Sequence, residues 1–167
     1  MDIINNQIDR LQTLYQRNIA LLILANIPYR EWQHEPILDF ATDEEVARQL
    51  GWTGTHSKSL FLKTKAGDYA LYLTEKDKRL DSKAIKSVLG KRVSICKDEE
   101  MIEQLDCVPG AVCPFGIPQH VEIIIDCELL EHQEILYTPG LPEYTLGFSG
   151  AQLKVLAALL PNQVHWL

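Results

Sequence analysis

The chain has 167 residues, 46% of them hydrophobic, and a formal net charge of −7. These values indicate a globular protein, and we expect a single domain over residues 1–167 with a full hydrophobic core. The acidic balance argues against a DNA partner and against broad nucleic-acid binding, which needs a basic surface. No apolar run is long enough to span a bilayer and no basic signal-peptide segment begins the chain, so we expect a cytoplasmic protein without a membrane partner.

Helical and extended patterns are mixed along the chain without a regular repeat. Apolar residues at near-helical spacing predict a long first helix that ends before Pro28. Thr42-Asp-Glu-Glu45 has the pattern of a capping box, and Lys65-Ala-Gly-Asp68 is typical of a hairpin turn. In chain order, the expected elements are helix 2–25, extended segment 29–38, helix 42–50, strands 59–64 and 69–75, helix 82–89 capped by Asp81, strand 93–96, a helix capped by Asp98 and reaching 105, strand 121–126, strands 135–137 and 144–148, and helix 151–160 capped by Ser149.

The residue types that bind metals or cofactors do not form a recognisable pattern. The four cysteines show no paired spacing typical of zinc sites, and the five histidines show no metal-ligand motif. We therefore expect no metal and no cofactor, and cysteines that are reduced thiols. Phosphate-binding loops and the GxSxG motif of serine hydrolases are also missing, so a nucleophilic triad is unsupported.

The loop Cys107–Gly116 is the first candidate for a functional site. It contains two glycines and two prolines among small residues, and glycine allows the backbone to approach a ligand closely. Backbone N–H groups presented by such a loop suit an oxyanion or a carbonyl oxygen. A plain connection between two elements is the alternative interpretation.

Three further positions carry charged or titratable groups that suit a site. Lys58 follows a glycine-containing turn and opens a strand, where its ammonium could bind a phosphate or carbonyl group or lie on the surface. His34 and His56 could face the same cleft or serve as surface and capping residues. Asp126 ends the most apolar strand, where it could orient a lysine or a substrate amine, or cap the following turn.

Four segments, which together span about residues 16–158, form an ordered set. They are Ile27-Pro-Tyr-Arg-Glu-Trp-Gln-His34-Glu-Pro, Lys58-Ser-Leu-Phe-Leu-Lys63, Asp77-Lys-Arg-Leu-Asp81 with its following helix, and Pro109-Gly-Ala-Val-Cys-Pro-Phe-Gly116 followed by Ile125-Asp126. In this order they resemble the YbaK/EbsC family of prolyl-tRNA-synthetase-associated editing domains.

The resemblance implies a fold and an activity. The fold is a compact α/β domain with a mixed, partly barrel-like sheet and flanking helices. The activity is hydrolysis in trans of the ester of mischarged aminoacyl-tRNA, mostly proline tRNA carrying a small wrong amino acid, without a metal. The implied partners are the acceptor end of aminoacyl-tRNA and prolyl-tRNA synthetase, and the terminal ribose hydroxyl is expected to help activate water. A binding module of the same fold, without turnover, is the alternative.

The resemblance also assigns roles to residues. Lys58 matches the functional lysine that holds the terminal nucleotide or the ester, and the N–H of Gly110 would polarise the ester carbonyl, with Pro114 making the loop rigid. The positions expected to bind substrate are His34, Ser59, Ala111, Val112, Cys113, Pro114, Asp126 and Thr138.

Two of these positions depart from the alanine-specific members. Ser59 stands where those members have Asn, and Thr138 stands where they have the His of F-H-P-G. Alanine, cysteine, serine and threonine therefore all remain candidates for the amino acid that is removed.

Overall fold

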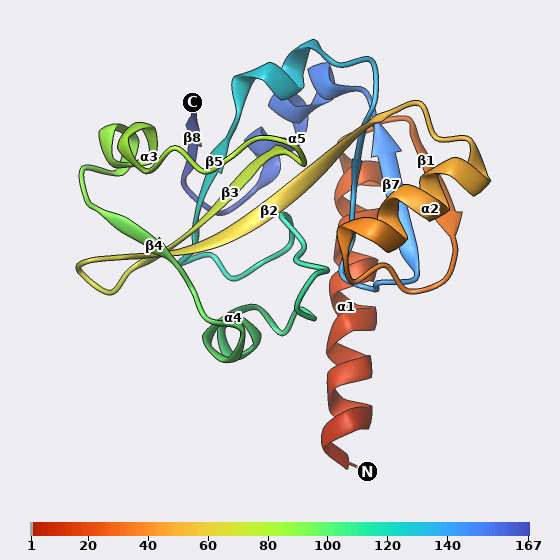
Figure 1. Ribbon diagram of the computed structural model, residues 1–167, viewed down its shortest axis with the longest axis horizontal. Coiled ribbons are helices and arrows are strands. Elements are labelled where there is room, and N and C mark those ends of the chain that lie inside the picture. Colours follow the sequence, from red (N-terminus) through yellow and green to blue (C-terminus); the bar gives the residue numbers. More distant parts are fainter. Residues whose placement is uncertain (1) are drawn as a thin grey trace.

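A computed structural model describes residues 2–167, so that only Met1 lies outside the described residues (Figure 1). Eight strands form a mixed sheet in the order β1-β7-β6-β2-β3-β5-β8, and β4 pairs with β2. The expected α/β class, with a mixed sheet flanked by helices, is confirmed. The strands are β1 (Tyr29–Gln33), β2 (Thr55–Thr64), β3 (Tyr69–Glu75), β4 (Val93–Ile95), β5 (Glu122–Ile125), β6 (Ile135–Tyr137), β7 (Tyr144–Phe148) and β8 (Val164–Trp166).

Helices lie at both ends of the sheet, and the N-terminal part of the first helix extends beyond it (Figure 1). No helix within residues 2–167 is long and apolar enough to cross a membrane. The helical elements are α1 (Asp2–Leu24), α2 (Phe40–Leu50), α3 (Ser82–Leu89), α4 (Asp98–Leu105), α5 (Leu153–Leu159) and the 3₁₀ turns η1 (Cys127–Glu131) and η2 (Gly150–Gln152).

The structure corrects the predicted limits of several elements. Strand β2 begins at Thr55 rather than at residue 59, so Lys58 lies within the strand instead of opening it. Asp39, not Thr42, caps α2, because its side chain accepts a hydrogen bond from the Thr42 N–H at 2.8 Å. The helix therefore begins two residues earlier than predicted. Asp98 is the first residue of α4 rather than its cap, and Ser149 makes no side-chain cap bond. Strand β8 was not expected.

The sheet is buried on both faces around β3 and β5. Leu71, Leu73, Ile123 and Ile125 pack into the larger hydrophobic cluster. The intervening residues of the same strands pack into a second cluster against Ile85 of α3. Alternation of side chains along a strand explains why a continuous apolar run marks a strand covered on both faces. Strand β5 lies between β3 and the edge strand β8 and is covered on both faces.

Asn18 connects α1 to the loop that precedes β5. Its side chain is fully buried and donates hydrogen bonds to Leu14 O at 2.9 Å and to Phe115 O at 3.0 Å. The Tyr137 hydroxyl of β6 donates to Asn18 Oδ1 at 3.1 Å. One buried amide thus joins the helix, the loop and the strand, and each polar group finds a partner.

Replacing Asn18 by Ala should lower the free energy of unfolding by about 1–3 kcal/mol, because Phe115 O and the Tyr137 hydroxyl lose a buried partner. Urea denaturation measures the change. Asn6→Ala is the matched control, since Asn6 lies exposed on the same helix. Equal stability of the two variants would show that the buried amide does not hold the loop.

Candidate functional site

A pocket of about 370 Å³ lies beside β2, between α2, the loop after α4 and the chain that follows β6. It brings together six positions named from the sequence. These positions are His56, Lys58, Ser59, Gly110, Val112 and Thr138. Its other lining residues are Ile37, Leu38, Asp39, Phe40, Asp43, Trp52, Ser57, Leu60, Leu136, Tyr137 and Thr145.

The pocket follows a part of β2 that has no neighbouring strand on one edge. On that edge, β6 pairs only with Thr55 and His56, and β4 pairs only with residues 62–64. Ser59 lies opposite Leu73, whose carbonyl accepts instead from the Asp126 N–H of the β5 side at 2.9 Å. Backbone groups alternate between the two edges of a strand, so the N–H and C=O of Ser59 face the open edge. This edge can bind a polar ligand.

Gly110 supplies the opposite wall of the pocket. Its φ is +86°, and a Cβ atom built on it would lie 2.0 Å from Leu38 O, so no other residue fits without movement of the backbone. The Ala111 N–H donates to Val108 O at 2.9 Å and closes the turn. Within residues 2–167, the Gly110 N–H has no acceptor. It is therefore available for a ligand.

Three loop residues expected to bind substrate lie elsewhere. Ala111, Cys113 and Pro114 are buried beneath the loop and do not line the pocket, whereas Val112 does. Side chains along an extended segment point alternately to opposite sides, which accounts for Ala111 and Cys113 on either side of Val112. Burial raises the pKa of the Cys107 thiol to about 11, and burial also raises the pKa of Cys113 well above its usual value. Neither thiol is suited to nucleophilic attack.

Lys58 is half-buried at the pocket. Its Nζ donates a hydrogen bond to the carbonyl oxygen of Lys78. Burial lowers the pKa of this ammonium, and the charge of Asp77 partly opposes that shift. A partly desolvated cation held by a neutral carbonyl keeps its charge available for a phosphate or an ester oxygen.

Asp126 supports this arrangement from outside the pocket. It accepts hydrogen bonds from Lys78 Nζ at 2.7 Å and from the Thr74 hydroxyl at 2.7 Å, and its other oxygen accepts from the Glu128 N–H at 3.0 Å. Both roles considered from the sequence are present, because Asp126 orients a lysine and caps η1. Asp126 is not among the residues that line the cavity, and its role in binding substrate stays a prediction.

His34 also lies behind the pocket wall rather than in it. Its Nδ1 lies 2.6 Å from Glu35 O, and a carbonyl oxygen only accepts, so Nδ1 carries the proton. Nε2 then accepts from the Thr145 hydroxyl at 2.8 Å. His34 thus orients Thr145, which lines the pocket.

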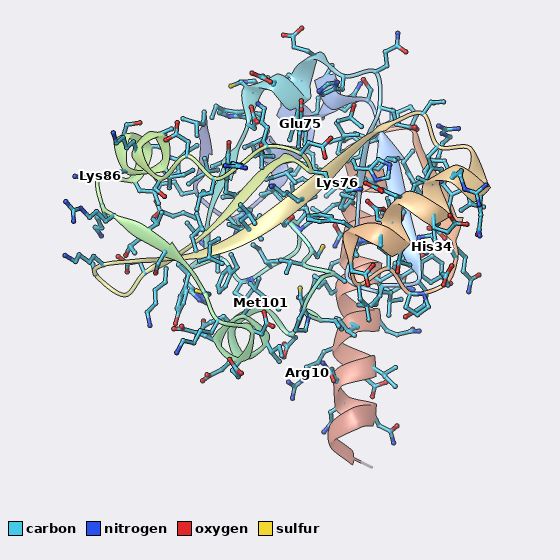
Figure 2. The ribbon with its side chains drawn as sticks, in the orientation of Figure 1. Arg10, His34, Glu75, Lys76, Lys86 and Met101 are labelled. Atoms are coloured by element: carbon cyan, nitrogen blue, oxygen red, sulfur yellow. The ribbon has the colours of Figure 1, made fainter. Side chains whose placement is uncertain are left out.

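The pair formed by His56 and Asp43 is a feature of the pocket that motif searching missed. His56 Nδ1 lies 2.6 Å from Asp43 Oδ2, and Lys76 Nζ lies 3.3 Å from the same oxygen. Burial acts to raise the pKa of the Asp43 carboxyl, but His56 and Lys76 together hold this pKa below its usual value. Figure 2 shows Lys76 on the side of the molecule where α2 packs. Among the described residues, no group of three or more metal-ligating side chains is suitably placed for an ion.

Comparisons with known proteins identify the family and the fold. The family model of the aminoacyl-tRNA editing domain matches residues 38–156. The Bacillus subtilis (strain 168) protein YwhH, described as uncharacterized, is 26% identical over 118 residues, which make up 67% of this chain and 75% of YwhH.

Two solved structures share the fold. The hypothetical protein APE2540 has a TM-score of 0.72 and 23% identity, and the match covers 86% of this chain and 93% of that protein. A proposed trans-editing enzyme for prolyl tRNA synthetase has a TM-score of 0.70 and 23% identity, over 92% and 96% of the two chains.

Gly110→Ala should destabilise the protein more than Gly67→Ala, as measured by urea denaturation. Both glycines have positive φ, +86° and +91°, but Gly67 has open space around it, whereas Gly110 meets Leu38 O. Gly67→Ala measures only the cost of an L-residue at positive φ, about 1–2 kcal/mol. Any further loss of stability in Gly110→Ala then comes from the clash with Leu38 O. A similar loss in both variants would mean that the approach to Leu38 imposes no constraint.

Asp126→Asn should lower the free energy of unfolding near neutral pH by about 1–3 kcal/mol. The free energy of unfolding of this variant should also change less as the pH is lowered. Burial acts to raise the pKa of Asp126, but Lys78, Thr74 and the Glu128 N–H lower it overall. A lowered folded-state pKa gives stability that is present above about pH 4 and is lost as pH falls through the folded value.

The measurement is urea denaturation from pH 7 to pH 3. Asp68→Asn is the control, since Asp68 forms an exposed pair with Lys91 at 2.9 Å. An acid dependence identical in Asp126→Asn and the wild type would contradict the role of this carboxylate.

Proposed function

This chain belongs to the aminoacyl-tRNA editing domain family, and we propose that it hydrolyses the ester of mischarged aminoacyl-tRNA in trans. The observation that carries the proposal is that Lys58 and Gly110, from distant parts of the sequence, line one pocket at the open edge of β2. The proposed substrate is proline tRNA carrying a small wrong amino acid such as alanine, cysteine or serine.

Charge stabilisation is the main catalytic demand of this reaction. An aminoacyl ester is already activated, and attack on its carbonyl carbon transfers negative charge to the carbonyl oxygen. The Gly110 N–H, which has no acceptor within residues 2–167, is the donor proposed for that oxygen. The Lys58 ammonium is proposed to hold the terminal nucleotide or the ester region.

The size and polarity of the pocket support a small side chain in the substrate. Val112, Leu136 and Tyr137 form apolar walls, while Ser59 and Thr138 add hydroxyl groups at the positions that depart from alanine-specific members. A pocket of fixed size rejects larger side chains more strongly than smaller ones. Hydroxyl groups inside it favour a substrate with a hydrogen-bonding side chain, which makes serine and cysteine strong candidates.

The distribution of charge suggests that contact with tRNA is limited to the acceptor end. The segment 58–92 is rich in lysine and arginine, but Lys63, Lys76, Lys78 and Lys91 pair with carboxylates. Within residues 2–167, the other six cations of this segment form no such pair, and those near the pocket can contact the acceptor end. The net charge of −7 leads us to expect low affinity for tRNA alone. Delivery of the mischarged tRNA by prolyl-tRNA synthetase would compensate for a low affinity for tRNA alone. The structural similarity to a proposed trans-editing enzyme for that synthetase supports this partner.

Deacylation of proline tRNA charged with alanine, cysteine or serine tests the proposal. At least one ester should be cleaved faster than in buffer, and Lys58→Ala should reduce kcat/KM by roughly 100-fold or more, since a charged contact to the reacting region is lost. Lys86→Ala should behave as the wild type, because Lys86 lies exposed on α3, at the opposite end of the molecule from α2 (Figure 2).

Thermal unfolding of each variant controls for loss of structure. Failure to cleave any ester, with or without prolyl-tRNA synthetase, would refute the enzymatic role. Thermal stabilisation by an aminoacyl-adenosine without hydrolysis would then identify a binding module.

A further inference from the structure

We propose that His56 is the general base of the ester hydrolysis and that Asp43 is its positioning residue. This inference rests on the proposed function, because it requires an aminoacyl ester in the pocket beside Lys58 and Gly110. It concerns two residues that lie on different elements, with His56 on β2 and Asp43 in the first turn of α2.

The hydrogen bond between the two residues fixes which nitrogen of His56 is free. Both side chains are only about one fifth exposed, and the Nδ1–Oδ2 distance is 2.6 Å. An ionised carboxylate only accepts hydrogen bonds, so Nδ1 carries the proton in the neutral imidazole and Nε2 keeps its lone pair. Within residues 2–167, Nε2 has no hydrogen-bond partner. The ring therefore presents an unoccupied base in a residue that lines the pocket.

Contacts to both the backbone and the imidazole ring of His56 fix its position. The His56 carbonyl accepts from the Lys76 N–H at 2.9 Å, which fixes the backbone of the strand. Trp52 packs against the imidazole with ring centroids 5.7 Å apart. The other charged groups around the pair are Glu44 and the cap Asp39 from the α2 side, Lys76 from the end of β3, and Lys58, two residues along the same face of β2.

The proposed step conserves atoms and charge. His56 Nε2 removes a proton from water as the water oxygen bonds to the ester carbonyl carbon, and the carbonyl oxygen takes the negative charge beside the Gly110 N–H. The tetrahedral intermediate collapses, the bond from carbon to the ribose oxygen breaks, and that oxygen takes the proton from Nε2. The products are the free amino acid and tRNA with its terminal hydroxyl restored.

Two other histidine–carboxylate pairs lie outside the pocket and serve as a comparison for His56 and Asp43. His132 Nε2 lies 2.5 Å from Glu75 Oε1, and His165 Nε2 lies 3.0 Å from Glu122 Oε1. Neither of these histidines lines the pocket. Such pairs can serve packing alone, and His132 is therefore a matched control for the proposal.

The test measures kcat and KM from pH 5 to pH 8.5 on alanyl, cysteinyl and seryl esters of proline tRNA. The wild type should lose kcat/KM at low pH, as protonation of Nε2 removes the base. His56→Gln should lower kcat by about 10²–10⁴-fold and remove that pH dependence. Asp43→Asn should lower kcat with little change in KM, while His132→Gln should match the wild type in both.

The possible failures are distinguishable. An active wild type with an unchanged pH profile in His56→Gln would overturn the inference alone and assign proton removal to the substrate's ribose hydroxyl. A wild type that cleaves no ester would overturn the proposed function and the inference with it. If His56→Gln does not fold, ¹⁵N spectra of the wild-type imidazole decide, because a proton on Nε2 of neutral His56 would rule out the base.

Discussion

The unpaired stretch of β2 is the constraint on which the site depends. This strand pairs along one edge with β3, but on the other edge it meets β6 at its start and β4 at its end. Between them the Phe61 carbonyl accepts from the Cys96 N–H at 2.9 Å, whereas the backbone groups of Ser59 must be satisfied by water or a ligand. Because α2 and the Gly110 loop lie on either side, this edge forms the wall of a pocket rather than a site for another strand.

Contacts distant in sequence hold the walls of the pocket in place. Gly110 packs against Leu38 so closely that a Cβ atom cannot fit, which joins the loop to the chain entering α2. Asn18 fixes the end of the same loop from α1, a helix outside residues 38–156 of the family match. Lys58 depends on Lys78, whose side chain is held in turn by Asp126. The pocket therefore depends on residues that never touch its interior.

Local sequence patterns were sufficient for most elements but not for their exact limits or for side-chain pairing. The hairpin from β2 to β3 and the helix between Asp81 and Gly90 follow from turn and capping residues. Asp39 and Thr42 are both good caps, and only the three-dimensional structure selects Asp39. Strand β8 has three residues, too few for a periodic signal, and pairs with β5 from across the fold. His56 and Asp43 meet only when α2 packs on β2, so no spacing rule could identify them.

A binding measurement at atomic resolution tests the location of the site most directly. The probe is a 3′-aminoacyl adenosine in which an amide replaces the labile ester, added to ¹⁵N-labelled protein in an NMR titration. Binding in the pocket predicts shifts concentrated at the backbone amides of Ser59, Gly110 and Val112, with little change in α3. Shifts confined to residues outside the pocket would refute the proposed site.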